Sequence, residues 1–341
     1  MEQPGFPAAP DASAVHGISP SRPARSSAKP VLFGAKLIVT AICFWYILRR
    51  IDMSEALRTL PTFDFRWVAF AVLLMLAQIP LLALRLQAIV QALEVKPARL
   101  TYLAANAVTA IYGLFAQALP SVVGEGVRAW MLTRLGCDWR TGLTSVMIDR
   151  GVGLGVLVSF AVVILSLPSA LNTLAGNREV VRLVLAGVLV IGMLGLLLTP
   201  RIAPVLQRWR YSYWIGSFAV DTRRALYGPQ AAKILGASCV IHSVTIVVIW
   251  SISRAQGLSL SAVDCAVLFT IVMGVVLIPI SIGGWGLREI AMVSLLGAHG
   301  VVPERALLFS LCLGLVFLVS ALPGAIVWLL YPLSASAGPT T

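Results

Sequence analysis

The chain has 341 residues, of which 59% are hydrophobic and 12% charged, with a mean hydropathy of +0.91 and a net charge of +12. Soluble chains carry roughly 25% charged residues, so this composition excludes soluble, disordered, collagen-like, coiled-coil and disulfide-scaffold classes and indicates an integral membrane protein. Nucleic-acid binding is disfavoured, because no basic run with interleaved aromatic residues occurs. Basic residues beside membrane spans explain the positive charge better.

The two ends of the chain differ in composition from its middle. Residues 1–30 are rich in Pro and Ser and predict a disordered tail. We expect a transmembrane domain over 31–332 and a short carboxy-terminal tail over 333–341. The first apolar stretch, 31–48, ends in two arginines without a small-x-small cleavage site, so it predicts a retained span rather than a signal peptide.

Apolar segments recur along the whole domain at the length a membrane helix needs, roughly 20 residues. They predict an all-α, polytopic bundle of about eight spans near 31–48, 67–90, 99–119, 142–167, 180–199, 233–253, 264–282 and 305–330. The longest connection, about 200–232, mixes basic and aromatic residues, which suits the level of the lipid headgroups.

Orientation follows from the distribution of Lys and Arg. With eight plain crossings, one side holds the loops 49–66, 120–141, 200–233 and 284–305, and it carries roughly twice as many basic residues as the other. That side is predicted to be cytoplasmic. This arrangement leaves the basic amino-terminal tail outside, a conflict that one re-entrant half-helix pair in place of a span would remove.

Two Gly/Pro-rich breaks interrupt the apolar pattern, ALPSVVGEGVRAWMLTRLG at 118–136 and LIPISIGGWGLREIAMVSLLG at 277–297. In each, a proline ends an apolar helix, a glycine follows four residues later, and an arginine and a carboxylate come at the start of a new helix. The breaks lie about 160 residues apart, which predicts an internal repeat with discontinuous helices around a central site. The alternative is that these residues merely end and cap helices.

The residue types in the breaks favour an anionic ligand. Glycines allow close approach of the backbone, a helix start presents unpaired N–H groups, and arginine offers a fork of donors that matches phosphate. The carboxylates could hold the arginines in place or compete with the ligand. The candidate substrate-binding residues are Arg128, Arg288, Glu125, Glu289, Gly124, Gly283, Gly284, Gly286, Asp149 and Arg150.

Asp149 and Arg150 belong to this set because they lie inside an apolar span, where a charge costs roughly 2.5–3.5 kcal/mol. Adjacent residues on a helix point about 100° apart, so the two are expected to have separate partners. A purely structural ion pair is the alternative. The glycines that follow, Gly151, Gly153 and Gly155, predict close helix packing.

Metal and cofactor sites are not expected. The five cysteines are scattered singly and the chain has three histidines, which excludes a rich metal centre. His242 is interpreted as a hydrogen-bonded core residue and Gln78 as an interhelical hydrogen-bonding residue. The sequence also lacks a Walker-type phosphate loop, so this chain is not expected to hydrolyse ATP.

The segments LPSVVGEGVRAWML, VMIDRGVGL and PISIGGWGLREIAMVSLLGAHGV resemble signatures of the flippase-like family related to the transmembrane region of lysylphosphatidylglycerol synthases. The likeness covers nearly the whole chain after residue 30. Many members have an acidic residue where this chain has Gly153, so Asp149 is the expected acidic partner. The resemblance implies handling of anionic phospholipids or polyprenyl-phosphate lipids in the bacterial inner membrane.

The leading hypothesis is therefore a lipid flippase or transporter, with the anionic headgroup between Arg128 and Arg288. Its expected partners are membrane lipids and an enzyme of lipid synthesis, and no nucleic acid. Enzyme activity is not expected, because aminoacyl-transferring relatives carry a soluble catalytic domain that has no counterpart in this sequence. Two alternatives stay open: a non-catalytic partner of a lipid-modifying enzyme, and a membrane transferase on lipid-linked substrates.

Overall fold

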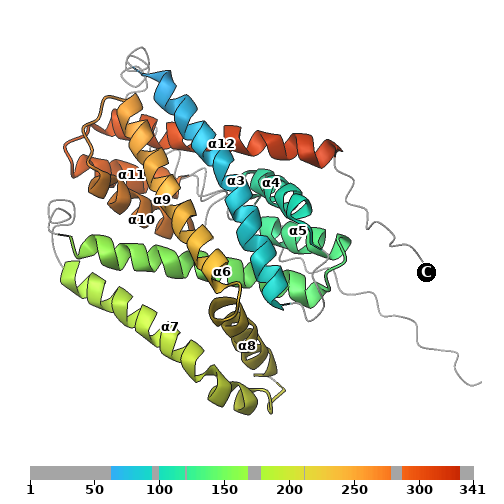
Figure 1. The fold of residues 1–341 in the computed structure, drawn as a ribbon. Helices are drawn as coiled ribbons and strands as arrows, with labels where there is room; N and C mark the ends of the chain where they lie inside the picture. Colours follow the sequence, from blue (N-terminus) through green and yellow to red (C-terminus); the bar gives the residue numbers. More distant parts are fainter. Residues whose placement is uncertain are drawn as a thin grey trace, which may run out of the picture.

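The structure is a computed structural model that describes residues 63–93, 100–119, 121–167, 178–210, 212–277 and 286–330. These residues form an all-α bundle, as predicted (Figure 1). Its helices are α3 (Phe65–Leu93), α4 (Tyr102–Ala118), α5 (Ser121–Arg134), α6 (Trp139–Leu165), α7 (Arg178–Leu206), α8 (Tyr213–Tyr227), α9 (Ala231–Ala255), α10 (Ala262–Leu277), α11 (Leu287–Gly297) and α12 (Pro303–Leu330). The predicted tails at 1–30 and 333–341 and the predicted span at 31–48 lie outside the described residues.

Five of the described helices, α3, α6, α7, α9 and α12, are long and apolar enough to cross a membrane. They match five of the predicted spans. The segments predicted at 99–119 and 264–282 instead contain α4 and α10, each followed by a second short helix, α5 or α11. A helix rises 1.5 Å per residue, so α4, with 17 residues, falls short of a bilayer core of roughly 30 Å, and α10 is described only as far as Leu277. The chain is thus a multi-pass membrane protein with two broken helices.

The helix order long, short, short, long occurs twice, as α3 to α6 and as α9 to α12. The packing also corresponds: α3 lies against α9, α4 against α12, and α10 against α6. Between α3 and α9, Gln78 donates to Thr245 at 3.3 Å and Arg85 donates to Ser238 at 3.2 Å. In a repeat of about 160 residues, Gln78 corresponds to Ser238 and Arg85 corresponds to Thr245. The two hydrogen bonds therefore join equivalent positions of the two halves, as the contacts of a two-fold symmetric interface do. The structure therefore contains the internal repeat that the two breaks predict.

The two central helices, α3 and α9, run antiparallel (Figure 1). The beginning of α3 meets the end of α9, where the amide of Asp64 donates to the carbonyl of Ala255 at 2.9 Å. A two-fold axis that reverses a membrane-spanning helix lies in the membrane plane, so the halves form an inverted repeat. Eight plain crossings would make α3 and α9 parallel, so the antiparallel arrangement favours the alternative, in which one re-entrant pair of short helices replaces a span between them.

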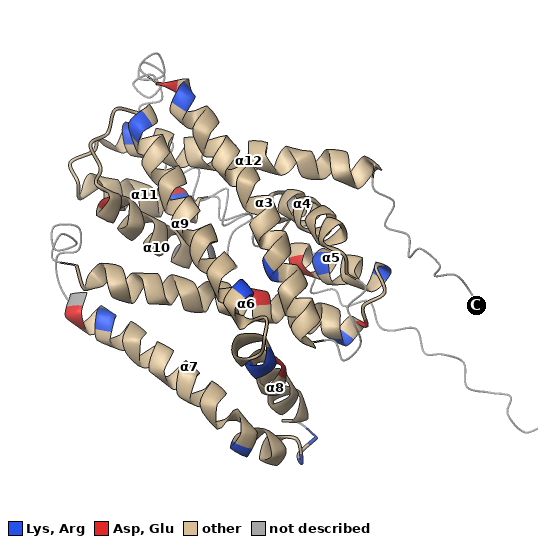
Figure 2. Cartoon of the chain, viewed as in Figure 1, with Lys and Arg blue, Asp and Glu red and all other residues tan. Residues whose placement is uncertain are grey.

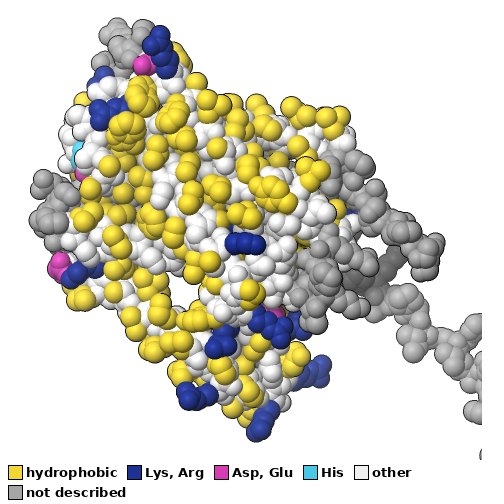
Figure 3. Space-filling view, in the orientation of Figure 1, with side chains coloured by type: hydrophobic (Ala, Val, Ile, Leu, Met, Phe, Trp, Pro, Cys, Tyr) yellow, Lys and Arg dark blue, Asp and Glu magenta, His cyan; other side chains and the backbone are white. Residues whose placement is uncertain are grey.

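This arrangement also corrects the predicted grouping of loops. Residues 201–233, with α8, follow α7 and lead into the beginning of α9. Arg66 begins α3 at the opposite end of α9, where Asp64 meets Ala255, and Arg305 is in the first turn of α12, whose Ala306 shares a buried cluster with Leu258 just after α9. Arg66 and Arg305 are therefore opposite the basic connection at 201–233, and Figure 2 shows Lys and Arg at both ends of the bundle. Figure 3 shows hydrophobic side chains over the middle of the visible face and Lys and Arg gathered around α7 and α8.

The two halves are held together by close helix packing as well as by α3 and α9. Leu86, Val108 and Met131 share one buried cluster of α3, α4 and α5, and a larger cluster joins α9 to α12. At Gly324 of α12 a side chain would overlap the carbonyl oxygen of Ala110 in α4. By contrast, α7 has no buried residue in its apolar window and contacts α6 and α8, so lipid surrounds most of it.

The close contact at Gly324 gives a stability prediction. Gly324→Ala forces α12 away from α4 and should lower the free energy of unfolding by about 1–3 kcal/mol, the cost of overpacking. Thermal unfolding in detergent measures the change. The matched control is Gly192→Ala on α7, where a side chain meets nothing within 4 Å, and it should unfold at or above the wild-type temperature. Equal midpoints for the two variants would contradict the packing described here.

The inverted repeat gives a topology prediction. In a cysteine-free background, Arg208→Cys before α8 and Val302→Cys before α12 should react with a membrane-impermeant thiol reagent from opposite sides of the membrane. Both residues are exposed in the structure. Eight plain crossings predict labelling from the same side, so that result would refute the antiparallel arrangement.

Candidate functional site

The centre of the bundle contains a buried carboxylate, Asp149 of α6, which joins three helices. Its Oδ1 accepts from Nε of Arg85 on α3 at 2.7 Å, and its Oδ2 accepts from Nη1 of Arg128 on α5 at 2.8 Å. All three side chains are less than a tenth exposed. Arg85 also donates to Ser238, so the cluster reaches α9. Asp149 is the acidic partner expected in this span.

Arg150, the next residue on α6, has different partners, as the helical geometry predicts. Its guanidinium pairs with Glu125 of α5 and donates to the hydroxyl of Tyr112 on α4 at 2.7 Å. That hydroxyl in turn donates to Glu125 at 2.7 Å, and the guanidinium of Arg128 lies 5.1 Å from the centre of the Tyr112 ring. Arg150 is 43% exposed, so this second network is at the surface of the bundle whereas Asp149 is inside it.

A cavity of about 300 Å³ adjoins both networks. Its polar wall includes Arg85, Arg128, Asp149, Arg150, Tyr112, Thr109, His242 and Thr245, and its apolar wall includes Leu82, Leu154, Leu157, Ile241, Phe269 and Met273. Leu154, one turn from Arg150 on α6, is 47% exposed. The lining of the cavity therefore combines charged and apolar side chains.

The glycine stripe on α6 has a different role from the predicted close packing. Side chains added at Gly151 or Gly155 would meet nothing within 4 Å, and one at Gly153 would come only within 3.9 Å of Arg85. The prediction of close packing is wrong here because the space beside the stripe is open and Gly153 lines the cavity. The carbonyl of Gly153 faces Nε2 of His242 at 3.1 Å.

Charge and hydrogen bonding around the cavity are not fully balanced. Arg85, Arg128 and Arg150 face two carboxylates, Glu125 and Asp149, which leaves a net charge of +1 with His242 neutral. In addition, Nε of Arg128, Oγ1 of Thr109 and Oε2 of Glu125 are buried and form no hydrogen bond. Buried polar atoms usually have a partner, so these atoms indicate space for a polar guest, and the net charge favours an anion.

The second break forms a separate cluster. Arg288 and Glu289 begin α11 and are 1% and 0% exposed. The guanidinium of Arg288 donates to Glu289 at 2.6 Å, and the hydroxyl of Ser310 donates to the same carboxylate oxygen at 3.0 Å. The amide of Gly286, at a φ of 88° that favours glycine, donates to Glu289 at 2.6 Å. None of these residues lines the cavity.

The structure thus brings together Arg128, Asp149 and Arg150 at the cavity and Glu125 beside it. Arg288, Glu289 and Gly286 lie together elsewhere, and Gly124 packs against Ala116 of α4 at ordinary contact distance. Gly283 and Gly284 lie outside the described residues. Sequence reasoning missed Arg85 and Tyr112. The signal for Arg85 was present, because a lone arginine inside an apolar span requires a partner.

Comparison with known proteins agrees with the membrane architecture. The model of one family, described as "Lysylphosphatidylglycerol synthase TM region", matches residues 33–324. This range includes the whole cavity and both breaks. No curated protein matches the chain.

The central position of Asp149 gives a prediction for stability. Asp149→Asn keeps the shape of the side chain but leaves the buried guanidinium groups of Arg85 and Arg128 without their shared counter-charge. The free energy of unfolding should fall by about 3–5 kcal/mol, measured by thermal or denaturant unfolding in detergent. Glu179→Gln, which breaks a surface pair with Arg182 on α7, is the control and should cost less than about 1 kcal/mol. Similar losses in both variants would show that Asp149 does not anchor the three helices.

Proposed function

The chain belongs to the family of lysylphosphatidylglycerol synthase transmembrane regions, and from that premise we propose that it is a flippase-like lipid transporter. The anionic headgroup binds in the cavity beside Arg128 and Arg150, while the acyl chains lie along its apolar wall and in the bilayer. The observation that carries this proposal is the cavity itself, whose lining combines a net positive charge with apolar side chains, among them the partly exposed Leu154 of α6.

An anionic headgroup is favoured over a neutral or cationic one by the charges. Three guanidinium groups and two carboxylates leave one positive charge unneutralised at membrane depth, where a charge without a partner is costly. A phosphate would supply the missing negative charge. Arg150 would contact the phosphate first, because its side chain is partly exposed. Arg85 and Arg128 are buried and are paired with Asp149.

A lipid is favoured over a small water-soluble anion by the rest of the lining. Leu154, Leu157 and Phe269 continue the cavity away from the arginines. Apolar side chains of this kind make no favourable contact with a soluble phosphate, but they can pack against the upper part of an acyl chain or a polyprenyl tail. We therefore propose phospholipids or polyprenyl-phosphate lipids of the bacterial inner membrane as the substrate class.

The same cavity argues against a catalytic role for the chain. Both carboxylates near the cavity, Glu125 and Asp149, are paired with arginines, so both are engaged within the bundle rather than with a ligand. We propose that the chain binds and moves lipids without reacting with them. A lipid-synthesis enzyme is then a partner that supplies the substrate.

The test is translocation of a fluorescent phosphatidylglycerol in proteoliposomes, with binding measured on the same protein in detergent. Arg150→Gln should reduce both binding and translocation at least about tenfold, because it removes a hydrogen-bonding charge from the mouth of the cavity. Arg182→Gln, at an exposed arginine of α7, is the control and should leave both unchanged. All variants must insert and unfold like the wild type.

Three other results would change this conclusion. Binding without translocation would favour the role of partner to a lipid-modifying enzyme. Failure of the wild type to bind or move any anionic lipid would overturn the proposal. Loss of translocation in Arg288→Gln, with normal stability, would extend the site to the second break.

A further inference from the structure

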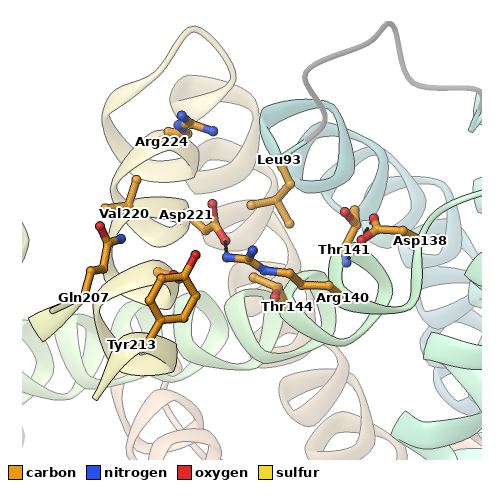
Figure 4. Close-up of a pocket in the computed structure, with 11 residues that line it drawn as sticks. Leu93, Asp138, Arg140, Thr141, Thr144, Gln207, Tyr213, Val220, Asp221 and Arg224 are labelled. Atoms are coloured by element: carbon orange, nitrogen blue, oxygen red, sulfur yellow. Dashed lines mark hydrogen bonds and ion pairs between the residues drawn. The ribbon is translucent and has the colours of Figure 1, made fainter. Parts of the chain in front are cut away.

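A second pocket, of about 330 Å³, lies between the beginning of α6, the end of α7 and α8 (Figure 4). It is separate from the central cavity. Arg140, Thr141 and Thr144 line this pocket, whereas Asp149 and Gly153 line the cavity. At about 100° per residue, these two sets lie on roughly opposite faces of α6.

The charges in this pocket are balanced, unlike those of the cavity. Arg140 reaches across to Asp221 of α8, with 3.7 Å between Nη2 and Oδ2, and Arg224 lies one turn further along α8 (Figure 4). Asp138 is turned toward the amide of Thr141, which donates to it at 3.3 Å as the amino-terminal cap of α6. The two carboxylates disfavour binding of a ligand that carries only negative charge, and the two guanidinium groups disfavour binding of a ligand that carries only positive charge.

One side of the pocket is suited to an ammonium group. The phenol ring of Tyr213 is turned toward Asp221 (Figure 4), and an adjoining hollow of about 130 Å³ is lined by Tyr213, Trp214 and Asp221 as well as by Arg140 and Thr144. A carboxylate flanked by aromatic rings is the combination that binds ammonium groups. Burial raises the pKa of Asp221, although Arg140 and Arg224 both oppose the shift.

The other side of the pocket is suited to phosphate. Arg140 is 53% exposed and can keep a contact with Asp221 while donating to a ligand. Thr141 and Thr144 line the same wall near the amino-terminal end of α6, where Asp138 already accepts from the amide of Thr141. The pocket lies at the basic end of the bundle beside the exposed aromatic residues Trp209 and Trp214, which is the level of lipid headgroups.

We infer that the pocket between α6 and α8 binds a zwitterionic headgroup with phosphate and ammonium groups, of the phosphoethanolamine type. The ammonium group lies against Asp221, Tyr213 and Trp214, and the phosphate lies against Arg140 and the two threonines. This site binds a different lipid class from the cavity and does not depend on the proposed transport.

The test is native mass spectrometry of the full chain in detergent, titrated with phosphatidylethanolamine and, separately, with phosphatidylglycerol. Asp221→Asn should weaken phosphatidylethanolamine binding at least about tenfold and leave phosphatidylglycerol binding unchanged. Asp264→Asn, which removes a carboxylate at the far end of the bundle, is the matched control and should change neither. Arg150→Gln should affect phosphatidylglycerol alone, so failure at one site is distinguishable from failure at the other.

Because Asp221→Asn could disturb packing of α8, Trp214→Leu provides a second variant at a side chain that is 53% exposed. It should weaken phosphatidylethanolamine binding by roughly threefold to tenfold through loss of the aromatic face. Competition by soluble O-phosphoethanolamine would identify the headgroup alone as the ligand, and its failure to compete would identify the whole lipid. Equal binding of the two lipids, or binding that neither variant weakens, would overturn the inference.

Discussion

Two arginines at membrane depth share one buried carboxylate, and much of the bundle is organised around this contact. An unpaired charge there costs several kcal/mol, so Arg85 and Arg128 are stable in their positions only while Asp149 is between them. Since the three residues come from α3, α5 and α6, the contact fixes the broken helix pair α4 and α5 against the central helices. The cavity exists in this form because that pair is held in place.

The two halves of the chain share a backbone plan but not their charges. In the second half the carboxylate that neutralises Arg288 is its own neighbour, Glu289, within the first turn of α11. In the first half the carboxylate comes from the following long helix instead, and the position equivalent to Arg150 in the second half is Ser310. The Arg288–Glu289 pair is therefore balanced in charge, whereas the three arginines and two carboxylates around the cavity keep one positive charge. This difference places the candidate anion site on one side of the two-fold axis.

Local patterns in the sequence predict much of this protein. The two breaks, the repeat and the separate partners of Asp149 and Arg150 follow from helix periodicity, from Gly and Pro, and from the cost of buried charge. The missing information concerns contacts between helices. Hydropathy does not distinguish α4 and α10 from complete crossings, nothing local tells Tyr112 from an ordinary aromatic residue, and Gly151 and Gly155 have the same spacing as glycines that pack closely. Only the arrangement of α3 against α9 settles the direction of each helix.

The surplus positive charge of the cavity has an electrical consequence. A headgroup with one negative charge would form a neutral complex with the site, and a membrane voltage would do no work on that complex as it moved. A headgroup with two negative charges would leave the complex at −1, and each 100 mV would then contribute about 2.3 kcal/mol to its passage. In the proposed transport cycle, the count of arginines and carboxylates around the cavity thus determines whether the membrane potential acts on the loaded site or on the return of the empty site, whereas the charge moved per cycle is that of the ligand.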